Sequence, residues 1–413
     1  MIIEFAPMEG ITGFVFRRAH VALFSGVSDY YLPFIATHAT RTLKTKERED
    51  ASPANNAGLS AVPQLLSKNA DDCLWYLDAL RQMGYRRVNL NLGCPSPTVT
   101  AKGKGAAMLG DAEGLRRFLD GIFSKEPGIR ISVKTRLGIE DPSEIFGLLS
   151  VYNRFPLDEL IVHGRTLSEA YRGAGHPELL PEILGQCKAP LCYNGNIFLP
   201  DDAERLRELC PGLERIMIGR GLIRNPALAR EILGRMEASG KTTPAVRGGY
   251  GRIPEGGGSP GRILEVPGGY GRIPEGGGSG RSREAGAASP ALSAAELSGS
   301  CIISTSGSAA SPALSAAELS RFLDAVYQGY RETLPGPVPV LGRMKELWYY
   351  TEDLFRTPEP GTSAFRALRG LKKARTFRDY ETAKAAFFAC PPEMEEGTPW
   401  KKNAALTGGW AKA

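Results

Sequence analysis

The segment RVNLNLGCP at residues 87–95 is the most informative stretch of this 413-residue chain. It has the pattern of a short apolar strand that ends at Asn91 and is followed by Gly93, Cys94 and Pro95. A cysteine is most often a small buried apolar side chain, and we adopt this interpretation for the six other cysteines. Cys94 differs because a glycine and a proline hold it just past a strand end. This setting predicts a thiol that points at a ligand.

The same kind of apolar run recurs along residues 1–237, and amphipathic helical patterns separate most of these runs. Asp71 to Met83 places three leucines on one stripe, and Asp111 precedes a second helical stripe as a predicted cap. Eight strand units with helical crossovers predict an α/β fold, a (β/α)8 TIM barrel, whereas a doubly wound sheet would usually need fewer strands. The predicted strands are Ile2–Phe5, Tyr30–Ile35, Ala61–Gln64, Val88–Asn91, Ile131–Lys134, Glu159–Val162, Leu191–Asn194 and Arg215–Ile218.

Polar or charged residues recur where the predicted strands stop. In a barrel these ends converge on one rim, where barrel enzymes build their sites. One such residue would more often be a strand cap or part of a salt bridge, but a set drawn from seven strands predicts a functional site. The set consists of Glu9, Gln64, Asn91, Lys134, Arg136, His163, Arg165, Asn194, Asn196 and Arg220.

The chain is predicted to have four parts: a barrel domain at 1–239, an insertion at 240–314, a helical domain at 315–390 and a flexible tail at 391–413. Duplicated segments mark the insertion: GGYGRIPEGGGS at 248–259 and 268–279, and AASPALSAAELS at 287–298 and 309–320. Glycine, serine and proline dominate there, so we expect a disordered linker. Ser315 and Glu318 have capping-box spacing, which predicts the start of the first helix of a small bundle.

The third predicted helix of the bundle is basic. A solvated surface is the commoner meaning of such a helix, and contact with a phosphate backbone is the alternative. The formal net charge of +6 is compatible with a polyanionic partner but does not require one. The basic residues include Arg366, Arg369, Lys372 and Lys373.

The cysteines lack the paired short spacings of a disulfide framework or a zinc site, so the sequence predicts a reducing, cytoplasmic compartment and no metal. The N-terminal residues MIIEFAPMEG have neither a basic region nor a long apolar core, so no leader is expected. No apolar run approaches the roughly 18 residues that span a bilayer. We therefore expect no membrane partner, and we expect a monomer.

Several segments together resemble the tRNA-dihydrouridine synthases, flavoenzymes that reduce selected uridines in tRNA. The resemblance implies FMN as cofactor, NADPH as reductant and tRNA as partner, with reduction of the uracil C5=C6 bond at specific uridines of the D-loop. It also implies that reduced FMN gives a hydride from N5 to C6 and that Cys94 gives the proton to C5. The bundle at 318–390 resembles that family's C-terminal helical domain. The matching barrel segments are APMEGIT (6–12), VPQLLSKN (62–69), NLNLGCPSPTV (89–99), KGKGAAML (102–109), SVKTRLG (132–138), VHGRT (162–166), YNGNI (193–197) and MIGRGLIRNP (217–226).

The family pattern implies further residue roles. The isoalloxazine and ribityl region would contact Pro7, Met8 and Glu9. The pyrimidine edge of the flavin would meet Gln64, its N1 and C2 carbonyl would meet Lys134, and His163 would bind the flavin or its phosphate. The phosphate would lie on backbone N–H groups of Asn194, Gly195, Asn196, Gly219 and Arg220. The substrate nucleotide or RNA would meet Asn91, Arg136 and Arg165, and the tRNA backbone would meet Arg366, Arg369, Lys372 and Lys373. For Asn91, capping of the strand end is the alternative role.

Two other functions fit parts of the pattern. A flavin barrel that reduces a free pyrimidine or small enone, like dihydroorotate or dihydropyrimidine dehydrogenase, would share the fold and the cysteine. It would not need the basic bundle. An RNA-binding protein with a non-catalytic barrel would not need the set Gln64, Cys94, Lys134 and His163.

Overall fold

The structure, a computed structural model, describes residues 1–240 and 313–395. The repeats of the predicted insertion and residues 396–413 of the predicted tail lie outside the described residues. The strands follow the predicted order, and three of them have the predicted bounds. They are β1 (Ile2–Phe5), β2 (Asp29–Tyr31), β3 (Ile35–Ala36), β4 (Ala61–Val62), β5 (Gln64–Leu66), β6 (Arg87–Asn91), β7 (Arg130–Arg136), β8 (Leu160–His163), β9 (Leu191–Asn194) and β10 (Arg215–Ile218).

All neighbouring strands pair in parallel, in the order β3–β5–β6–β7–β8–β9–β10–β1–β2–β4. β4 and β5 are two pieces of one extended segment separated by Pro63, which has no N–H to donate to a ladder. β4 pairs with β2 and β5 pairs with β3, so the two ends of the order meet and the sheet closes. The predicted TIM barrel is therefore confirmed, with two of its eight strands interrupted.

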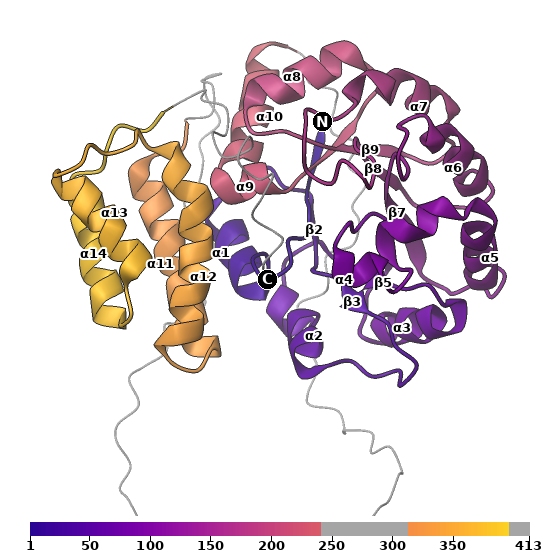
Figure 1. The fold of residues 1–413 in the computed structure, drawn as a ribbon, viewed down its shortest axis with the longest axis horizontal. Helices are drawn as coiled ribbons and strands as arrows, with labels where there is room; N and C mark the ends of the chain where they lie inside the picture. The colour runs from indigo at the N-terminus through magenta and orange to yellow at the C-terminus, as the bar shows by residue number, and fades with distance from the viewer. Residues whose placement is uncertain (241–312, 396–413) are drawn as a thin grey trace, which may run out of the picture. The chain divides into compact units, whose positions relative to one another are not determined.

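Helices connect most of the strands and surround them (Figure 1). The predicted stripe after Asp111 forms α5, where the Asp111 carboxylate accepts from the N–H of Gly114 at 2.8 Å and four apolar residues are buried. The barrel helices are α1 (Phe14–Leu23), α2 (Thr45–Asp50), α3 (Ala70–Gln82), α4 (Pro97–Thr100), α5 (Ala112–Phe123), α6 (Glu144–Tyr152), α7 (Leu180–Gln186), α8 (Pro200–Leu209), α9 (Arg220–Arg224) and α10 (Leu228–Ala238).

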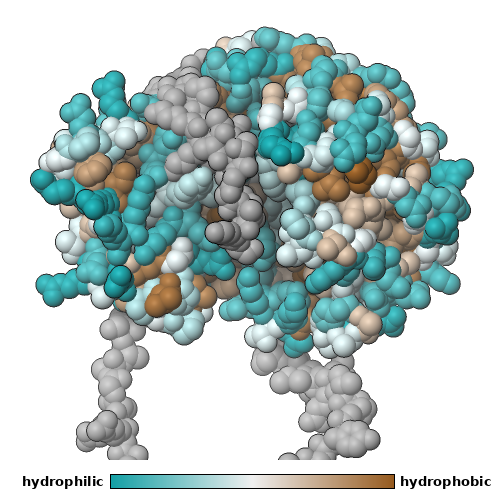
Figure 2. All heavy atoms as spheres, viewed as in Figure 1, coloured by the Kyte–Doolittle hydropathy of each residue, from teal (hydrophilic) through white to brown (hydrophobic). Residues whose placement is uncertain are grey.

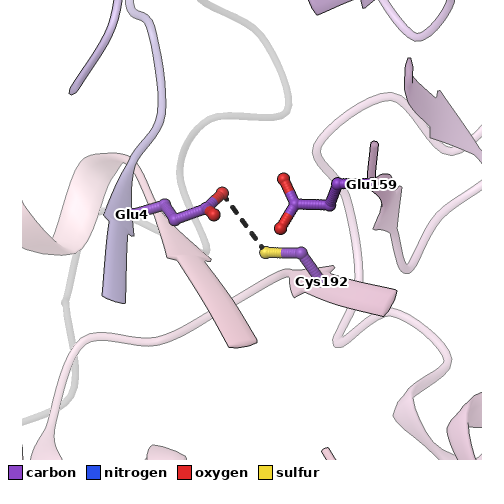
Figure 3. A group of neighbouring side chains, drawn as sticks. All are labelled: Glu4, Glu159 and Cys192. Carbon is purple, nitrogen blue, oxygen red and sulfur yellow. Dashed lines mark hydrogen bonds between the residues drawn. The ribbon is translucent and has the colours of Figure 1, made fainter. Parts of the chain in front are cut away.

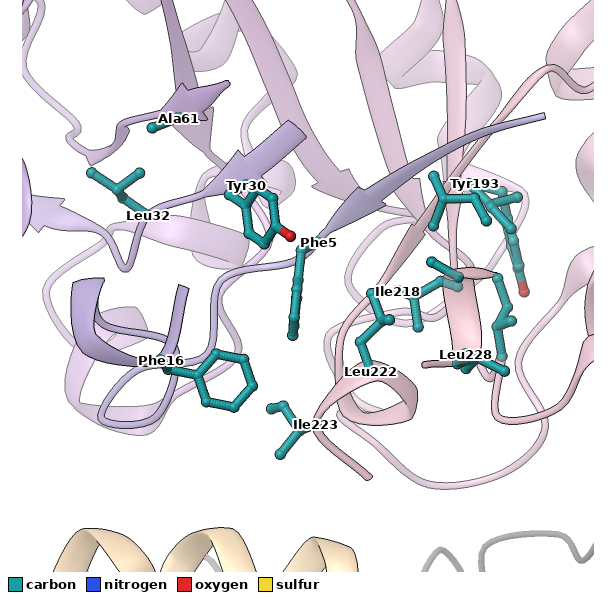
Figure 4. Packing of buried hydrophobic residues seen from close by; sticks show 14 of the residues in the cluster. Phe5, Phe16, Tyr30, Leu32, Ala61, Tyr193, Ile218, Leu222, Ile223 and Leu228 are labelled. Carbon is teal, nitrogen blue, oxygen red and sulfur yellow. The ribbon is translucent and has the colours of Figure 1, made fainter. Parts of the chain in front are cut away.

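Alternation along the strands separates two cores. One set of strand side chains packs outward against the helices, as Figure 4 shows for Phe5 and Ile218 of the strands near Phe16 of α1. The other set forms a small separate cluster of six buried residues, which fills the middle of the barrel. This inner apolar layer consists of Ala6, Tyr31, Val62, Ile161, Cys192 and Met217. It separates the polar side chains at the two ends of the barrel interior.

The C-terminal helices are α11 (Ala316–Thr333), α12 (Pro337–Thr351), α13 (Ser363–Lys373) and α14 (Phe377–Ala389). Ser315 caps α11 with Glu318 in the predicted capping box. The bundle packs against the barrel, since the Phe322 ring lies 5.3 Å from that of Phe16, edge to face. Within residues 1–240 and 313–395, no helix combines the length and apolar composition needed to cross a membrane.

Candidate active site

Cys94 lies in the loop that leaves the carboxyl end of β6. The Asn91 side-chain oxygen accepts from the N–H groups of Gly93 (3.1 Å) and Cys94 (2.9 Å), and so fixes the start of this loop. The Cys94 carbonyl accepts from the N–H of Ala106 at 3.1 Å. A Cβ on Gly105 would lie 2.8 Å from the same carbonyl oxygen, so only glycine permits the return of the loop. The thiol is half-buried, which is consistent with a position at the rim of the barrel where the strands end.

A chain of buried amides extends from this loop across three strands. The Asn91 amide donates to Gln64 at 2.8 Å, Gln64 donates to Asn89 at 2.8 Å, and Asn89 donates to Ser132 at 2.9 Å. Asn89 and Gln64 are fully buried. The chain fixes the Gln64 carboxamide and, through Asn91, the Cys94 loop. Sequence reasoning missed Asn89, although it lies two residues before Asn91 and therefore on the same face of β6.

Burial governs the protonation of Cys94. Desolvation raises the pKa of the thiol above its ordinary value, while Arg136 and Lys134 lower it by a smaller amount. The thiol is therefore protonated at neutral pH. The two cations would stabilise a thiolate once a proton had left.

Lys134 lies on β7 beside Asn91 of β6, with which it is in register, and its side chain is on the same face of the sheet. Desolvation, reinforced by Arg136, lowers the pKa of its ammonium group to about 7. Among the residues that the structure describes, none forms a hydrogen bond or an ion pair with this ammonium group. A half-buried cation without a protein partner is a suitable binding point for an anionic ligand.

His163 lies at the end of β8 beside Arg165, whose guanidinium nitrogen is 3.3 Å from Nε2. Arginine only donates, so Nε2 is the acceptor and Nδ1 carries the hydrogen of a neutral ring. Burial and the cations Arg136 and Lys134 hold the pKa of this imidazole well below its ordinary value. His163 can therefore offer one N–H donor to a ligand.

The two strand-end arginines are buried and bonded to backbone carbonyls, which differs from the expectation that they face the substrate nucleotide or RNA. Arg136 is 1% exposed and donates at 2.8 Å to the carbonyls of Gly93, Thr166 and Ala170. Arg165 is fully buried and donates to the carbonyls of Arg172 and Gly173. Each would have to give up these bonds to contact a nucleotide.

Tyr171, which sequence reasoning also missed, lies in the loop after β8. Its ring centroid is 5.4 Å from the guanidinium carbon of Arg136 and 5.4 Å from that of Arg220. The His163 ring lies 6.1 Å away. Tyr171 is 39% exposed, so it presents an aromatic surface at the mouth of the barrel. No strand pattern marks a loop residue of this kind.

The loops after β9 and β10 lie close together, as the predicted phosphate site requires. Arg220 donates to the Asn196 side chain at 3.0 Å, and a Cβ on Gly221 would lie 2.1 Å from the Ile197 carbonyl oxygen. Asn194 instead holds β10 through its bond to the Met217 carbonyl at 2.8 Å. Gly195 lies over the Tyr193 ring, where a Cβ would clash with the hydroxyl at 2.3 Å.

The loop after β1 carries the remaining predicted flavin contacts. Pro7 and Met8 are partly buried, and the Met8 N–H donates to the Thr12 hydroxyl at 2.8 Å. The Met8 sulfur lies 3.9 Å from where a Cβ on Gly219 would be, so this loop adjoins the β10 loop. Glu9 is exposed and pairs with Lys46 at 3.5 Å.

The four predicted tRNA contacts of the bundle all lie exposed on α13, in a mostly hydrophilic part of the surface (Figure 2). Lys372 is already paired with Glu352 at 2.8 Å, and Arg366 donates to the Gly361 carbonyl at 2.8 Å. Arg366 and Lys373 also line a groove between α13 and α14, together with Arg378 on the opposite side. The groove therefore has a basic rim.

A second polar cluster joins Cys192 of the inner apolar layer to two carboxylates toward the other end of the barrel. Figure 3 shows Glu4, Glu159 and Cys192 facing one another, with their ligand atoms within 4.8 Å. Arg215 already contacts both carboxylates, at 3.4 and 3.3 Å, and supplies the positive charge that a metal ion would bring. Burial and the facing Glu159 raise the pKa of Glu4 well above its ordinary value. We therefore interpret this cluster as a structural, partly protonated group of side chains that fills this end of the barrel interior.

A family model described as dihydrouridine synthase matches residues 4–247. The tRNA-dihydrouridine(16) synthase of Ralstonia nicotianae is 30% identical over 237 residues, which cover 56% of this chain and 72% of that protein. The protein of the same name from Pseudomonas syringae pv. tomato is 30% identical over 244 residues, covering 56% and 74%.

Among solved structures, morphinone reductase aligns with a TM-score of 0.40 at 14% identity, covering 56% of this chain and 85% of that one. This likeness is too weak to bear on function. The family model, in contrast, spans more than half of the chain and includes the barrel strands, the Cys94 loop and the strand ends that carry Lys134, His163 and Arg220. The chain therefore belongs to the dihydrouridine synthase family, whose members reduce uridine in tRNA.

Proposed function

We propose that this protein uses bound FMN, reduced by NADPH, to convert a uridine of the tRNA D-loop to dihydrouridine, with Cys94 as the proton donor. The observation that carries the proposal is that one barrel mouth holds both the protonated, half-buried Cys94 thiol and the Lys134 ammonium, which has no hydrogen-bond or ion-pair partner among the described residues. A thiol can protonate a carbon, and a cation can hold an electron-rich ring.

The residues present fit FMN. The ammonium of Lys134 would meet N1 and the C2 carbonyl, the Gln64 amide would bond the pyrimidine edge, and the His163 Nδ1–H would bond the ring or its phosphate. Pro7, Met8 and Glu9 would line the ribityl side, and the phosphate would lie by Asn196, Gly219 and Arg220. When bound and reduced, the flavin supplies a hydride from N5 to C6 of the uracil.

Hydride addition at C6 leaves an enolate on the uracil that needs a proton at C5. The Cys94 thiol donates that proton, and its raised pKa keeps the donor form populated at neutral pH. Lys134 and Arg136 stabilise the resulting thiolate until solvent returns the proton. Asn91 holds the Cys94 loop and keeps one amide hydrogen for the uracil edge.

A uridine inside folded tRNA has to leave its stack to reach this mouth. The exposed cations Arg369 and Lys373 on α13, with Arg366 and Arg378 at the groove, would hold the RNA backbone during that step. The matched relatives are named for uridine 16, so position 16 is the first candidate.

The test is to incubate the purified protein with FMN, NADPH and unmodified tRNA, and to map dihydrouridine by position. Free uridine and uracil serve as competing substrates. We expect product in tRNA only; turnover of the free pyrimidine alone would favour a small-molecule reductase. Cys94→Ala should retain flavin and lower product formation by roughly 10²- to 10⁴-fold, while the exposed Cys390→Ala should behave like the wild type.

A further inference from the structure

Three lysines gather around one glycine of the loop that carries Cys94. Lys102 and Lys104 flank Gly103, whose φ of +66° turns the loop back sharply. Lys68, just after β5, approaches the same glycine: its Nζ lies 3.6 Å from where a Cβ on Gly103 would be. We call Lys68, Lys102 and Lys104 the lysine cluster.

Lys104 is the member of the cluster whose hydrogen bond to another loop is seen in the described part of the chain. The Lys104 ammonium donates to the Thr37 carbonyl in the loop after β3. Lys68 and Lys102 are exposed. Within residues 1–240 and 313–395, no carboxylate forms an ion pair with either of these two ammonium groups.

The charges facing one another here are mostly positive. Burial, followed by repulsion from Lys68 and Lys102, lowers the pKa of Lys104. Asp72 is the carboxylate that opposes this effect, and it already pairs with Arg41 at 3.3 Å. Three ammonium groups that repel one another at an exposed rim are complementary to a ligand with several negative charges.

The lysine cluster is also coupled to the catalytic loop. Lys104 is followed by Gly105 and Ala106, and the Ala106 N–H bonds to the Cys94 carbonyl at 3.1 Å. A polynucleotide whose base lies against Cys94 carries a phosphate on either side of that nucleotide. A lysine ammonium is a point charge suited to such phosphates.

We propose that the lysine cluster binds the phosphate backbone of tRNA next to the uridine that is reduced. This inference rests on the proposed function. It adds a contact made by the barrel rim itself, apart from the basic helix α13.

The test compares Lys68→Gln/Lys102→Gln with the matched control Lys125→Gln/Lys188→Gln. The control lysines are exposed in loops that precede β7 and β9, at the opposite end of the barrel. Lys104 is left unchanged because it is bonded to Thr37. The tRNA dissociation constant is measured between 50 and 300 mM salt, together with the rate of flavin reduction by NADPH.

Each lost phosphate contact reduces the slope of log affinity against log salt by about 0.7 to 0.9. The double variant should therefore lose about 1.4 to 1.8 of the slope and bind tRNA roughly 25- to 60-fold more weakly at 0.1 M salt, with unchanged flavin reduction. A slope and affinity equal to those of the control would overturn the inference. So would a defect confined to reduction by NADPH, which would place the dinucleotide phosphates at the cluster. If the wild type forms no dihydrouridine in tRNA, the proposed function is refuted, independently of the results for the lysine variants.

Discussion

Replacing Lys134 with methionine should stabilise the protein freed of flavin and, at the same time, abolish tight flavin binding. In the folded protein the pKa of the Lys134 ammonium falls from 10.5 to about 7, chiefly because of desolvation. In the unfolded chain the same group keeps its proton up to about pH 10. Burial in the folded protein therefore disfavours the charged form of Lys134. We expect a bound ligand, and not another residue of the protein, to supply the compensating negative charge.

The size of the effect follows from the two pKa values. One pKa unit corresponds to about 1.4 kcal/mol, so lowering the pKa from 10.5 to about 7 costs roughly 4 kcal/mol of folding free energy at pH 7 as an upper estimate. Between pH 7 and pH 10.5 the unfolded chain binds more protons than the folded protein. The stability of the wild type should therefore rise with pH in this window, and Lys134→Met should lack that contribution.

The assay is urea unfolding of flavin-free wild type, Lys134→Met and Lys125→Met from pH 7 to pH 9.5. Lys125 is exposed at the other end of the barrel and provides the same change of charge without the burial. We expect Lys134→Met to be more stable than the wild type at pH 7, with the difference shrinking as pH rises. FMN titration should show at least a tenfold weaker affinity for Lys134→Met alone. If Lys134→Met is no more stable than Lys125→Met, or binds FMN normally, the assignment of Lys134 is wrong.

Three further predictions concern other parts of the chain. Asn89→Leu should lower the free energy of unfolding by about 2 to 5 kcal/mol, because Gln64 and Ser132 lose their buried partner; urea unfolding beside Ser132→Ala measures it, and a loss below 1 kcal/mol would contradict the amide chain. His20 is buried between Phe rings with its pKa lowered to about 4, so stability should fall by about 2 to 3 kcal/mol as pH drops from 7 to 4.5; His20→Leu should lack this dependence, and an equal slope in both proteins would refute it. Deleting residues 246–308 should leave tRNA affinity and turnover within about twofold, because the shortened connection can still bridge its two ends. Leu314 bonds to Glu231 at the start of α10, which lies about 14 Å along the helix from Gly240, whereas the remaining residues 241–245 and 309–312 can span up to roughly 30 Å. A larger loss of affinity or turnover would show that the insertion takes part in recognition.

The sequence specified the barrel because its signals are local. Apolar runs bounded by polar residues gave β1, β9 and β10 with their observed bounds, and Asp111 and Ser315 marked helix starts through capping chemistry. The interruption of two strands was not predicted, although Pro63 explains one of them, since proline cannot donate to a ladder.

The sequence also placed the predicted site residues at one rim, because parallel strands in a barrel end on the same side. Cys94, Gln64, Lys134 and His163 do converge there. Which of these groups are free to bind a ligand could not be predicted. Asn91 and Arg136 carry the same polar groups in any sequence. Here the Asn91 oxygen accepts from the N–H groups of Gly93 and Cys94, and Arg136 donates to the Gly93 carbonyl.

Only the tertiary structure distinguished a paired charge from an unpaired one. Glu4 occupies an ordinary strand position in the sequence, but the barrel interior buries it against Glu159 and Arg215, which come from strands far along the chain. The lysine cluster likewise joins Lys68 to Lys102 and Lys104 across a loop contact. Hydrogen-bond direction and desolvation depend on atoms brought together by chain closure, and no local pattern of residue types contains that information.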